Sequence, residues 1–153
     1  MSIKKMTLTQ ISEVAEIERL CFSHPWSEES IKDSFNNPCN HFYISEKENK
    51  ITGYIGLSVI IDEGYILNVA VHPDYQGMGI GKELVKYVND FAVENNLTFV
   101  TLEVRPSNEK AINLYTGFGF EKVGERKDYY SNPKENALLL TKYYISKNRI
   151  KKS

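Results

Sequence analysis

The sequence predicts a mixed α/β fold of the α+β kind, in which a mostly antiparallel sheet of six to seven strands carries about four helices on both faces. First, apolar residues follow the helical period near the N-terminus and again over residues 84–92. Second, they alternate with polar residues through residues 41–71, which is typical of strands joined by short turns. Third, the later helix lies between two strand patterns, residues 65–71 and 99–104, which predicts one parallel β-α-β unit.

Length and composition favour one domain over residues 1–153. With 41% hydrophobic and 25% charged residues, the chain can bury a core without disulfide or metal staples. Residues 147–153 are basic, and we expect them to form a flexible, solvated tail. The net charge of −1 gives no field that would attract nucleic acid, and no stretch approaches the roughly 18 apolar residues of a membrane span. We therefore expect no direct nucleic acid binding and no membrane association.

Cysteine and histidine usage favours a cytoplasmic protein without a metal. Cys21 and Cys39 form no C-x-x-C pair, and we expect both to be buried, reduced thiols. His24, His41 and His72 are isolated in the sequence, so no metal ligand is assigned. No apolar targeting segment follows the N-terminal lysines.

The elements are expected to begin with two helices. Thr9 can cap a helix over residues 10–21, whose apolar side is near the 3.6-residue period. Ser27 is a good N-cap for a second, shorter helix, and Trp26 with Ile31 has the spacing of a hydrophobic staple.

The rest of the chain predicts three strands, a helix, a strand, a short helix and two last strands. The expected ranges are residues 41–44, 51–61, 65–71, 84–96, 99–104, 108–115, 120–130 and 136–145.

Three glycines, Gly77, Gly79 and Gly81, stand where the 65–71 strand leads into the next helix. Several N–H groups lack partners at a helix start, and glycines let such groups curl around one phosphate. A P-loop would need glycine at position 76 and a hydroxyl after Lys82, and a dinucleotide fingerprint would need G-x-G-x-x-G. ATP bound in the P-loop manner is therefore excluded, and NAD is disfavoured. A plain glycine-rich turn is the alternative, although three glycines cost helix propensity.

The remaining pattern is Gln76-x-x-Gly79-x-Gly81, and with it the chain resembles the GNAT superfamily of acetyl-CoA-dependent N-acetyltransferases. The loop of that family reads Arg or Gln, two residues, Gly, one residue, then Gly or Ala. The segments NVAVHPDYQGMGIGKELV, LEVRPSNEKAINLYTGFGF and PWSEES extend the resemblance over nearly the whole chain. They are similar to bacterial members that acetylate the N-terminal alanine of a small-subunit ribosomal protein. The resemblance implies a GNAT-like fold.

The resemblance also implies where acetyl-CoA, the co-substrate, would bind. Its pyrophosphate would lie on backbone amides of the glycine loop, and its pantetheine arm would run like an extra strand beside the preceding strand. The implied coenzyme-binding residues are Val69, Ala70, Val71, Gln76, Gly77, Met78, Gly79, Ile80, Gly81, Lys82 and Asn108.

Two residues have implied catalytic roles. Glu103 interrupts an apolar strand, and the resemblance implies that it removes a proton from the incoming ammonium, directly or through a water. Tyr115 is implied as the general acid for the coenzyme A thiolate, and a backbone N–H near Val71 would polarise the acetyl carbonyl. The pattern alone leaves two alternatives open, a solvated strand carboxylate for Glu103 and a core tyrosine for Tyr115.

Three aromatic residues are candidates for binding the acceptor. Tyr129 and Tyr130 resemble the aromatic pair that lines the peptide groove of N-terminal acetyltransferases, and Trp26 lies where the family admits substrate. Ordinary strand aromatics and the hydrophobic staple explain them nearly as well.

The expected acceptor is a protein N-terminal peptide of ribosomal origin, and the expected state is a monomer or weak homodimer. A GNAT enzyme acting on lysine, a polyamine or another small amine remains open, as does a non-catalytic acetyl-CoA-binding module. A ribosome- or RNA-associated accessory protein using the basic tail is a further alternative, which the net charge of −1 disfavours.

Overall fold

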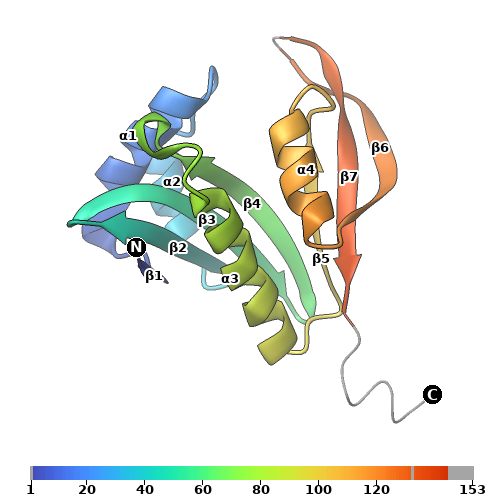
Figure 1. The fold of residues 1–153 in the computed structure, drawn as a ribbon, viewed down its shortest axis with the longest axis horizontal. Coiled ribbons are helices and arrows are strands. Elements are labelled where there is room, and N and C mark those ends of the chain that lie inside the picture. Colours follow the sequence, from blue (N-terminus) through green and yellow to red (C-terminus); the bar gives the residue numbers. More distant parts are fainter. Residues whose placement is uncertain (1, 132, 145–153) are drawn as a thin grey trace. The chain divides into compact units, whose positions relative to one another are not determined.

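The computed structural model describes residues 2–131 and 133–144, so the predicted tail at residues 147–153 lies outside the described part. Figure 1 shows the elements in chain order. They are β1 (Ser2–Lys5), η1 (Leu8–Gln10), α1 (Ile11–Cys21), α2 (Glu28–Phe35), β2 (Asn40–Lys47), β3 (Lys50–Ile60), β4 (Glu63–Val71), η2 (Pro73–Tyr75), α3 (Ile80–Glu94), β5 (Phe99–Val104), α4 (Glu109–Gly117), β6 (Glu121–Tyr130) and β7 (Glu135–Tyr143).

Within the described residues, seven strands form one sheet in the order β1-β2-β3-β4-β5-β7-β6. β4 and β5 are parallel, with Glu63 opposite Phe99 and Tyr65 opposite Thr101. The pairs β1–β2, β2–β3, β5–β7 and β6–β7 are antiparallel. The predicted mixed, mostly antiparallel sheet with one parallel β-α-β unit is therefore confirmed.

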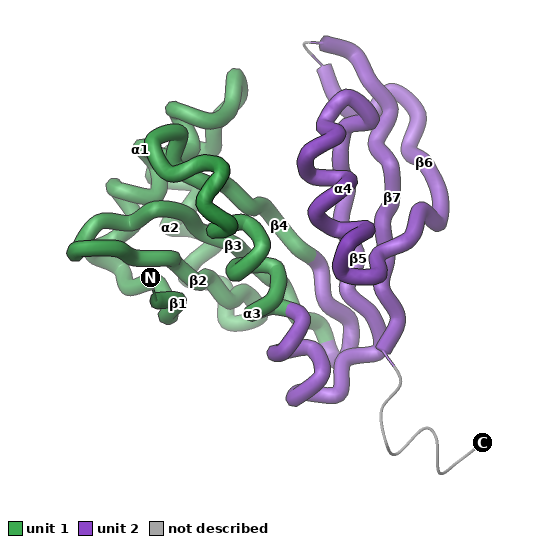
Figure 2. Tube along the Cα trace, in the orientation of Figure 1, with its two compact units in different colours: residues 1–60, 66–88 green, residues 61–65, 89–153 purple. Residues whose placement is uncertain are grey.

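The chain divides into two compact units, which Figure 2 distinguishes by colour. Unit 1 contains residues 1–60 and 66–88, and unit 2 contains residues 61–65 and 89–153. The strand β4 and the helix α3 each contribute residues to both units.

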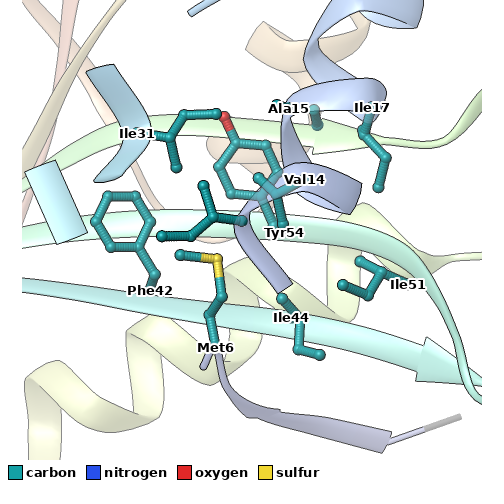
Figure 3. Close-up of a cluster of buried hydrophobic side chains, with 11 residues drawn as sticks. Met6, Val14, Ala15, Ile17, Ile31, Phe42, Ile44, Ile51 and Tyr54 are labelled. Carbon is teal, nitrogen blue, oxygen red and sulfur yellow. The ribbon is translucent and has the colours of Figure 1, made fainter. Parts of the chain in front are cut away.

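One face of the sheet in unit 1 packs against α1 and α2. Phe42 and Ile44 of β2 and Tyr54 of β3 lie in one buried cluster with Val14 of α1 and Ile31 of α2 (Figure 3). Because these side chains come from every second strand position, they share a face of the sheet. Burying this cluster is what fixes the two N-terminal helices to the sheet.

The opposite face of unit 1 packs against α3. Tyr43 lies between Phe42 and Ile44 in the sequence, and its ring centroid lies 4.6 Å from that of Tyr87 on α3. A Cβ atom at Gly53 would lie 3.1 Å from Ile80 and 3.2 Å from Leu84, so this glycine lets the helix approach the strand closely. Helices therefore cover both faces of the sheet in unit 1, as predicted.

Alternation along β5 organises the core of unit 2. Leu102 and Val104 are buried, whereas Glu103 between them is half-buried and points to the other face. On α4, the ring of the buried Tyr115 lies 5.4 Å from that of Phe120 in an edge-to-face arrangement.

Three local expectations have different outcomes. Ser27 caps α2 as predicted, because its Oγ accepts a hydrogen bond from Ser30 N at 3.0 Å. Thr9 is not the cap of α1, since it lies inside the short 3₁₀ turn η1 and Gln10 takes the N-cap position. Cys39 is exposed rather than buried, and Cys21 is half-buried.

Candidate active site

The glycine loop in unit 1 is exposed and has the backbone that only glycine adopts easily. Gly77 and Gly79 have φ angles of +81° and +80°, in the left-handed region that side chains rarely adopt. A Cβ atom at either position would meet no other atom within 4 Å. Contact with the rest of the protein therefore does not require glycine here, but the backbone conformation does.

The backbone amides of this loop are free to bind an anion. In the described part of the chain, residues 77–82 donate no backbone hydrogen bond, and the first bond of α3 runs from Glu83 N to Gly79 O at 3.1 Å. Free amides at a helix start, together with the helix dipole, favour a phosphate group. The loop therefore fits the diphosphate of coenzyme A.

One edge of the β4 backbone faces away from β3 near the end of the strand. His72 N donates to Thr52 O of β3 at 2.8 Å, so the backbone groups of Ala70, two residues earlier, face β3 and those of the alternate residues Val69 and Val71 face away from it. The Val71 carbonyl accepts bonds from the Gln76 side-chain amide and the Cys21 thiol, both at 3.2 Å, and Val69 N donates to Asn68 Oδ1 at 3.0 Å. An extended amide-bearing ligand, such as a pantetheine arm, would have to replace these bonds to pair with this edge.

Trp26 belongs to the segment between α1 and α2, and a buried carboxylate holds it there. Trp26 is half-buried against the core cluster, and its backbone N–H donates to Glu18 Oε1 at 3.0 Å. Glu18 is fully buried. Burial raises the pKa of its carboxyl, while the hydrogen bonds from Trp26 and Tyr54 act against this rise.

In unit 2, Glu103 takes part in a small polar cluster. Its Oε1 accepts a hydrogen bond from Arg126 Nε at 3.0 Å, and 28% of its side chain is exposed. A hydrogen bond to Glu103 also raises the pKa of Tyr129, whose ring lies 5.0 Å from that of Tyr130. The carboxylate is thus reachable from solvent and lies beside the predicted aromatic pair.

Arg105 fixes the second member of that pair. Its guanidinium lies 4.3 Å from the centre of the Tyr130 ring and donates to Glu135 at 3.1 Å. Burial, followed by the charge of Glu103, raises the pKa of Tyr130 to about 12. The Tyr130 ring is therefore fixed in position and its phenol is neutral, whereas Tyr129 is 52% exposed.

The two residues on α4 lie in different environments. Asn108 is exposed and caps the helix, since its Oδ1 accepts from Ala111 N at 3.2 Å. Tyr115 is 2% exposed and belongs to the core of unit 2, and burial raises its pKa. Unit 1 therefore carries the loop, Val69–Val71 and Trp26, and unit 2 carries the remaining predicted site residues.

Sequence reasoning missed the residues that hold the candidates in place. Glu18 was one polar position in a helix, and nothing in the pattern marked it as buried. Arg126 gave only a weak signal, as a charge close to Tyr129 in sequence. Its contact with Glu103 depends on the register of β6, β7 and β5, which sequence spacing does not fix.

The fold and the loop together define a class of protein, the transferases that hold an acyl-CoA on a strand end and a glycine loop. The Acetyltransferase (GNAT) family model matches residues 11–120. The chain belongs to this family and is an acetyl-CoA-dependent N-acetyltransferase.

Individual relatives agree with this. The ribosomal protein bS18 alanine N-acetyltransferase of Escherichia coli (strain K12) is 29% identical over 141 residues, which cover 91% of this chain and 95% of that protein. The N-alpha-acetyltransferase RimI of Mycobacterium tuberculosis is 33% identical over 135 residues, 84% of each chain. The crystal structure of the ribosomal-protein-S18-alanine N-acetyltransferase from Escherichia coli matches with a TM-score of 0.89 and 27% identity, covering 96% of this chain and 97% of the other.

The described residues contain neither a candidate metal site nor a candidate membrane-spanning helix. No group of three or more His, Cys, Asp or Glu side chains is placed to hold a metal ion there. None of the helices among those residues is long and apolar enough to cross a membrane.

Proposed function

We propose that this enzyme moves the acetyl group of acetyl-CoA to a protein N-terminal α-amine, namely the N-terminal alanine of a small-subunit ribosomal protein. The observation that carries the proposal is the match over nearly the full length of both chains to a ribosomal protein bS18 alanine N-acetyltransferase. An α-amine also suits a carboxylate base, because its pKa of about 8 lies well below the value of about 10.4 for lysine.

Glu103 is the base in this proposal. It takes a proton from the acceptor ammonium, directly or through a water, and the neutral amine then attacks the thioester carbonyl. The carboxylate is partly exposed and already binds one cation, the Arg126 guanidinium. The acceptor ammonium would compete with Arg126 for the same oxygen atoms. Tyr129 and Tyr130 would line the path of the peptide beside it.

The remaining steps use a backbone amide and a phenol. A C–N bond forms as the C–S bond breaks, and the Val71 N–H would stabilise the negative charge on the carbonyl oxygen. Tyr115 would give its proton to the departing coenzyme A thiolate, and the second proton that the attacking nitrogen loses would return to the Tyr115 phenolate through water. Residues 69–71, residues 76–82 and Asn108 would hold the coenzyme during transfer. We expect the enzyme to act in the cytoplasm, as a monomer or weak homodimer.

The test is acetyl transfer to defined acceptors, measured by mass spectrometry. We expect acetylation of a peptide with the alanine-initiated N-terminus of bS18, and none of the same peptide with a blocked N-terminus and an internal lysine, or of spermidine. Transfer to lysine or spermidine alone would show that the acceptor is not a protein N-terminus. Acetyl-CoA binding without transfer to any acceptor would show that the protein is a non-catalytic binding module.

Glu103→Gln tests the base in the same assay. We expect kcat to fall by about 10²–10⁴-fold with acetyl-CoA affinity retained, because the amide cannot accept the proton. Glu121→Gln is the matched control, since Glu121 is an exposed strand glutamate of β6, and its kcat should stay at the wild-type value. Unchanged turnover in Glu103→Gln would remove this residue as the base.

A further inference from the structure

Glu18 collects hydrogen bonds from three separate segments of unit 1. Its Oε1 accepts from Trp26 N at 3.0 Å, and its Oε2 accepts from Tyr54 Oη and Asn68 Nδ2, both at 2.8 Å. The side chain is fully buried beside the apolar cluster of α1, α2 and the sheet. A buried carboxylate is costly unless its oxygen atoms are well bonded, and here three donors compensate for that cost.

Packing alone does not explain a carboxylate at this position. An apolar side chain of similar size would fill the space without a desolvation penalty, but it would leave the buried Tyr54 hydroxyl and the half-buried Trp26 N–H without this acceptor. A glutamine has one acceptor oxygen and a donor group, so it cannot accept from all three donors at once. The carboxylate, which only accepts, serves all three segments together.

Glu18 accepts hydrogen bonds at both ends of the segment between α1 and α2, whose Phe22 and Trp26 also pack against the core cluster. Within the described residues, the backbone hydrogen bonds that hold positions 22–26 are Phe22 N to Glu18 O at 3.0 Å and Trp26 N to Glu18 Oε1 at 3.0 Å. The three residues between them, 23–25, are exposed. Glu18 thus fixes both ends of the segment, one with its backbone carbonyl and one with its side chain.

The same carboxylate reaches β4 just before the edge that would carry pantetheine. Asn68 donates to Glu18, and its own Oδ1 accepts from Val69 N at 3.0 Å. A displacement of Glu18 would therefore weaken its bond to Trp26 N and, through Asn68, shift Val69, the first residue of that edge.

We propose that Glu18 is a positioning residue for the acceptor peptide, which holds Trp26 and the 22–27 segment against β4 so that the first residues of the peptide meet a preformed apolar wall. This proposal rests on the proposed function, because it takes a peptide as the acceptor and Trp26, a candidate named from the sequence, as part of the peptide's binding site. Glu18 itself touches no substrate in it.

The experiment compares Glu18→Gln with Tyr54→Phe in the full chain. For Glu18→Gln we expect the KM for the alanine-initiated peptide to rise about tenfold, since the donors lose a charged acceptor and one of them loses its bond, with kcat within about twofold of wild type. Tyr54→Phe removes a donor from the same carboxylate but keeps the bond to Trp26 N, so the peptide KM should not change. A merely structural role would affect both variants alike.

A second measurement does not depend on activity. Trp26 is the only tryptophan in the chain, so its fluorescence reports this segment directly. We expect a red shift and stronger acrylamide quenching in Glu18→Gln and neither in Tyr54→Phe. Wild-type fluorescence and wild-type peptide KM in a folded Glu18→Gln would overturn the proposal.

If Glu18→Gln does not fold, hydrogen exchange of the wild-type protein still tests the proposal. The Trp26 amide lies outside any helix or strand, yet it should exchange much more slowly than its neighbours at 23 and 24, because Glu18 holds it. Rapid exchange at Trp26 would contradict the proposal. If the wild type acetylates no peptide, the proposed function fails, while fluorescence and exchange still decide whether Glu18 holds the segment.

Discussion

Tyr115 is a buried tyrosine whose proposed role is that of the general acid. Burial raises the pKa of its phenol, so the group stays protonated throughout the neutral range and has a proton to give when the C–S bond breaks. Tyr115→Phe should lower kcat by about 10²-fold and leave the fold intact, because the ring contact with Phe120 remains. The measurement is the rate of free thiol release at saturating acetyl-CoA.

Tyr144→Phe is the control for Tyr115→Phe. Tyr144 is also buried, at 9% exposure, and its hydroxyl donates to Asn89 Oδ1 at 2.9 Å. Loss of that bond should lower stability by about 1 kcal/mol without lowering kcat. A wild-type kcat in Tyr115→Phe would show that Tyr115 is not the general acid and has only a structural role.

Among single residues, the sequence predicted those inside short motifs and missed those that act across strands. The cap Ser27 was predicted, since it depends on a neighbour three positions away. Glu18 and Arg126 were not, because their partners lie 8 to 50 and 23 positions away in the chain. Such contacts exist only after the strands have paired in one register.

At the scale of elements, the connection from β4 through the glycine loop to α3 makes a sharp prediction. Gly79→Ala should cost about 1 kcal/mol of stability, because its φ angle is +80° and alanine resists that conformation. The affinity for acetyl-CoA should also fall at least about tenfold, since the added methyl group would lie on the open side that the diphosphate needs. Urea unfolding and calorimetric titration measure the two effects.

Gly117→Ala is the control that distinguishes an effect specific to the glycine loop from a general effect of replacing a glycine with alanine. Gly117 is the last residue of α4, its φ is not positive, and a Cβ atom there would meet nothing within 4 Å. Alanine should leave stability equal or slightly higher and acetyl-CoA affinity unchanged. A folded Gly79→Ala with normal affinity would refute the assignment of this loop to the diphosphate.

Elements with strong periodicity were predicted closely, and elements without it were missed. The range predicted for β5 matches Phe99–Val104 without change, because a regular alternation marks it. β1, Ser2–Lys5, was missed, since three of its four residues are exposed and it is defined by pairing with β2. A short edge strand has no buried face to leave a pattern in the sequence.

At the scale of the whole molecule, one domain was predicted and two compact units are found. The chain passes between the units three times, once in the turn after β3 and twice inside regular elements. β4 changes unit between Tyr65 and Ile66, and α3 changes unit between Val88 and Asn89. Domain boundaries usually fall in exposed, irregular segments, so neither unit is a self-contained length of chain.

We therefore expect one cooperative unfolding transition, with both units unfolding together. Breaking α3 or β4 at the division would forfeit backbone hydrogen bonds inside a helix and a strand, and this couples the two parts. Trp26 fluorescence reports unit 1, and hydrogen exchange in β5 and β7 reports unit 2. Their urea midpoints should coincide, and Tyr54→Phe in unit 1 should shift both midpoints by the same amount. Two separate midpoints, with only the first sensitive to Tyr54→Phe, would show that the units fold as independent domains.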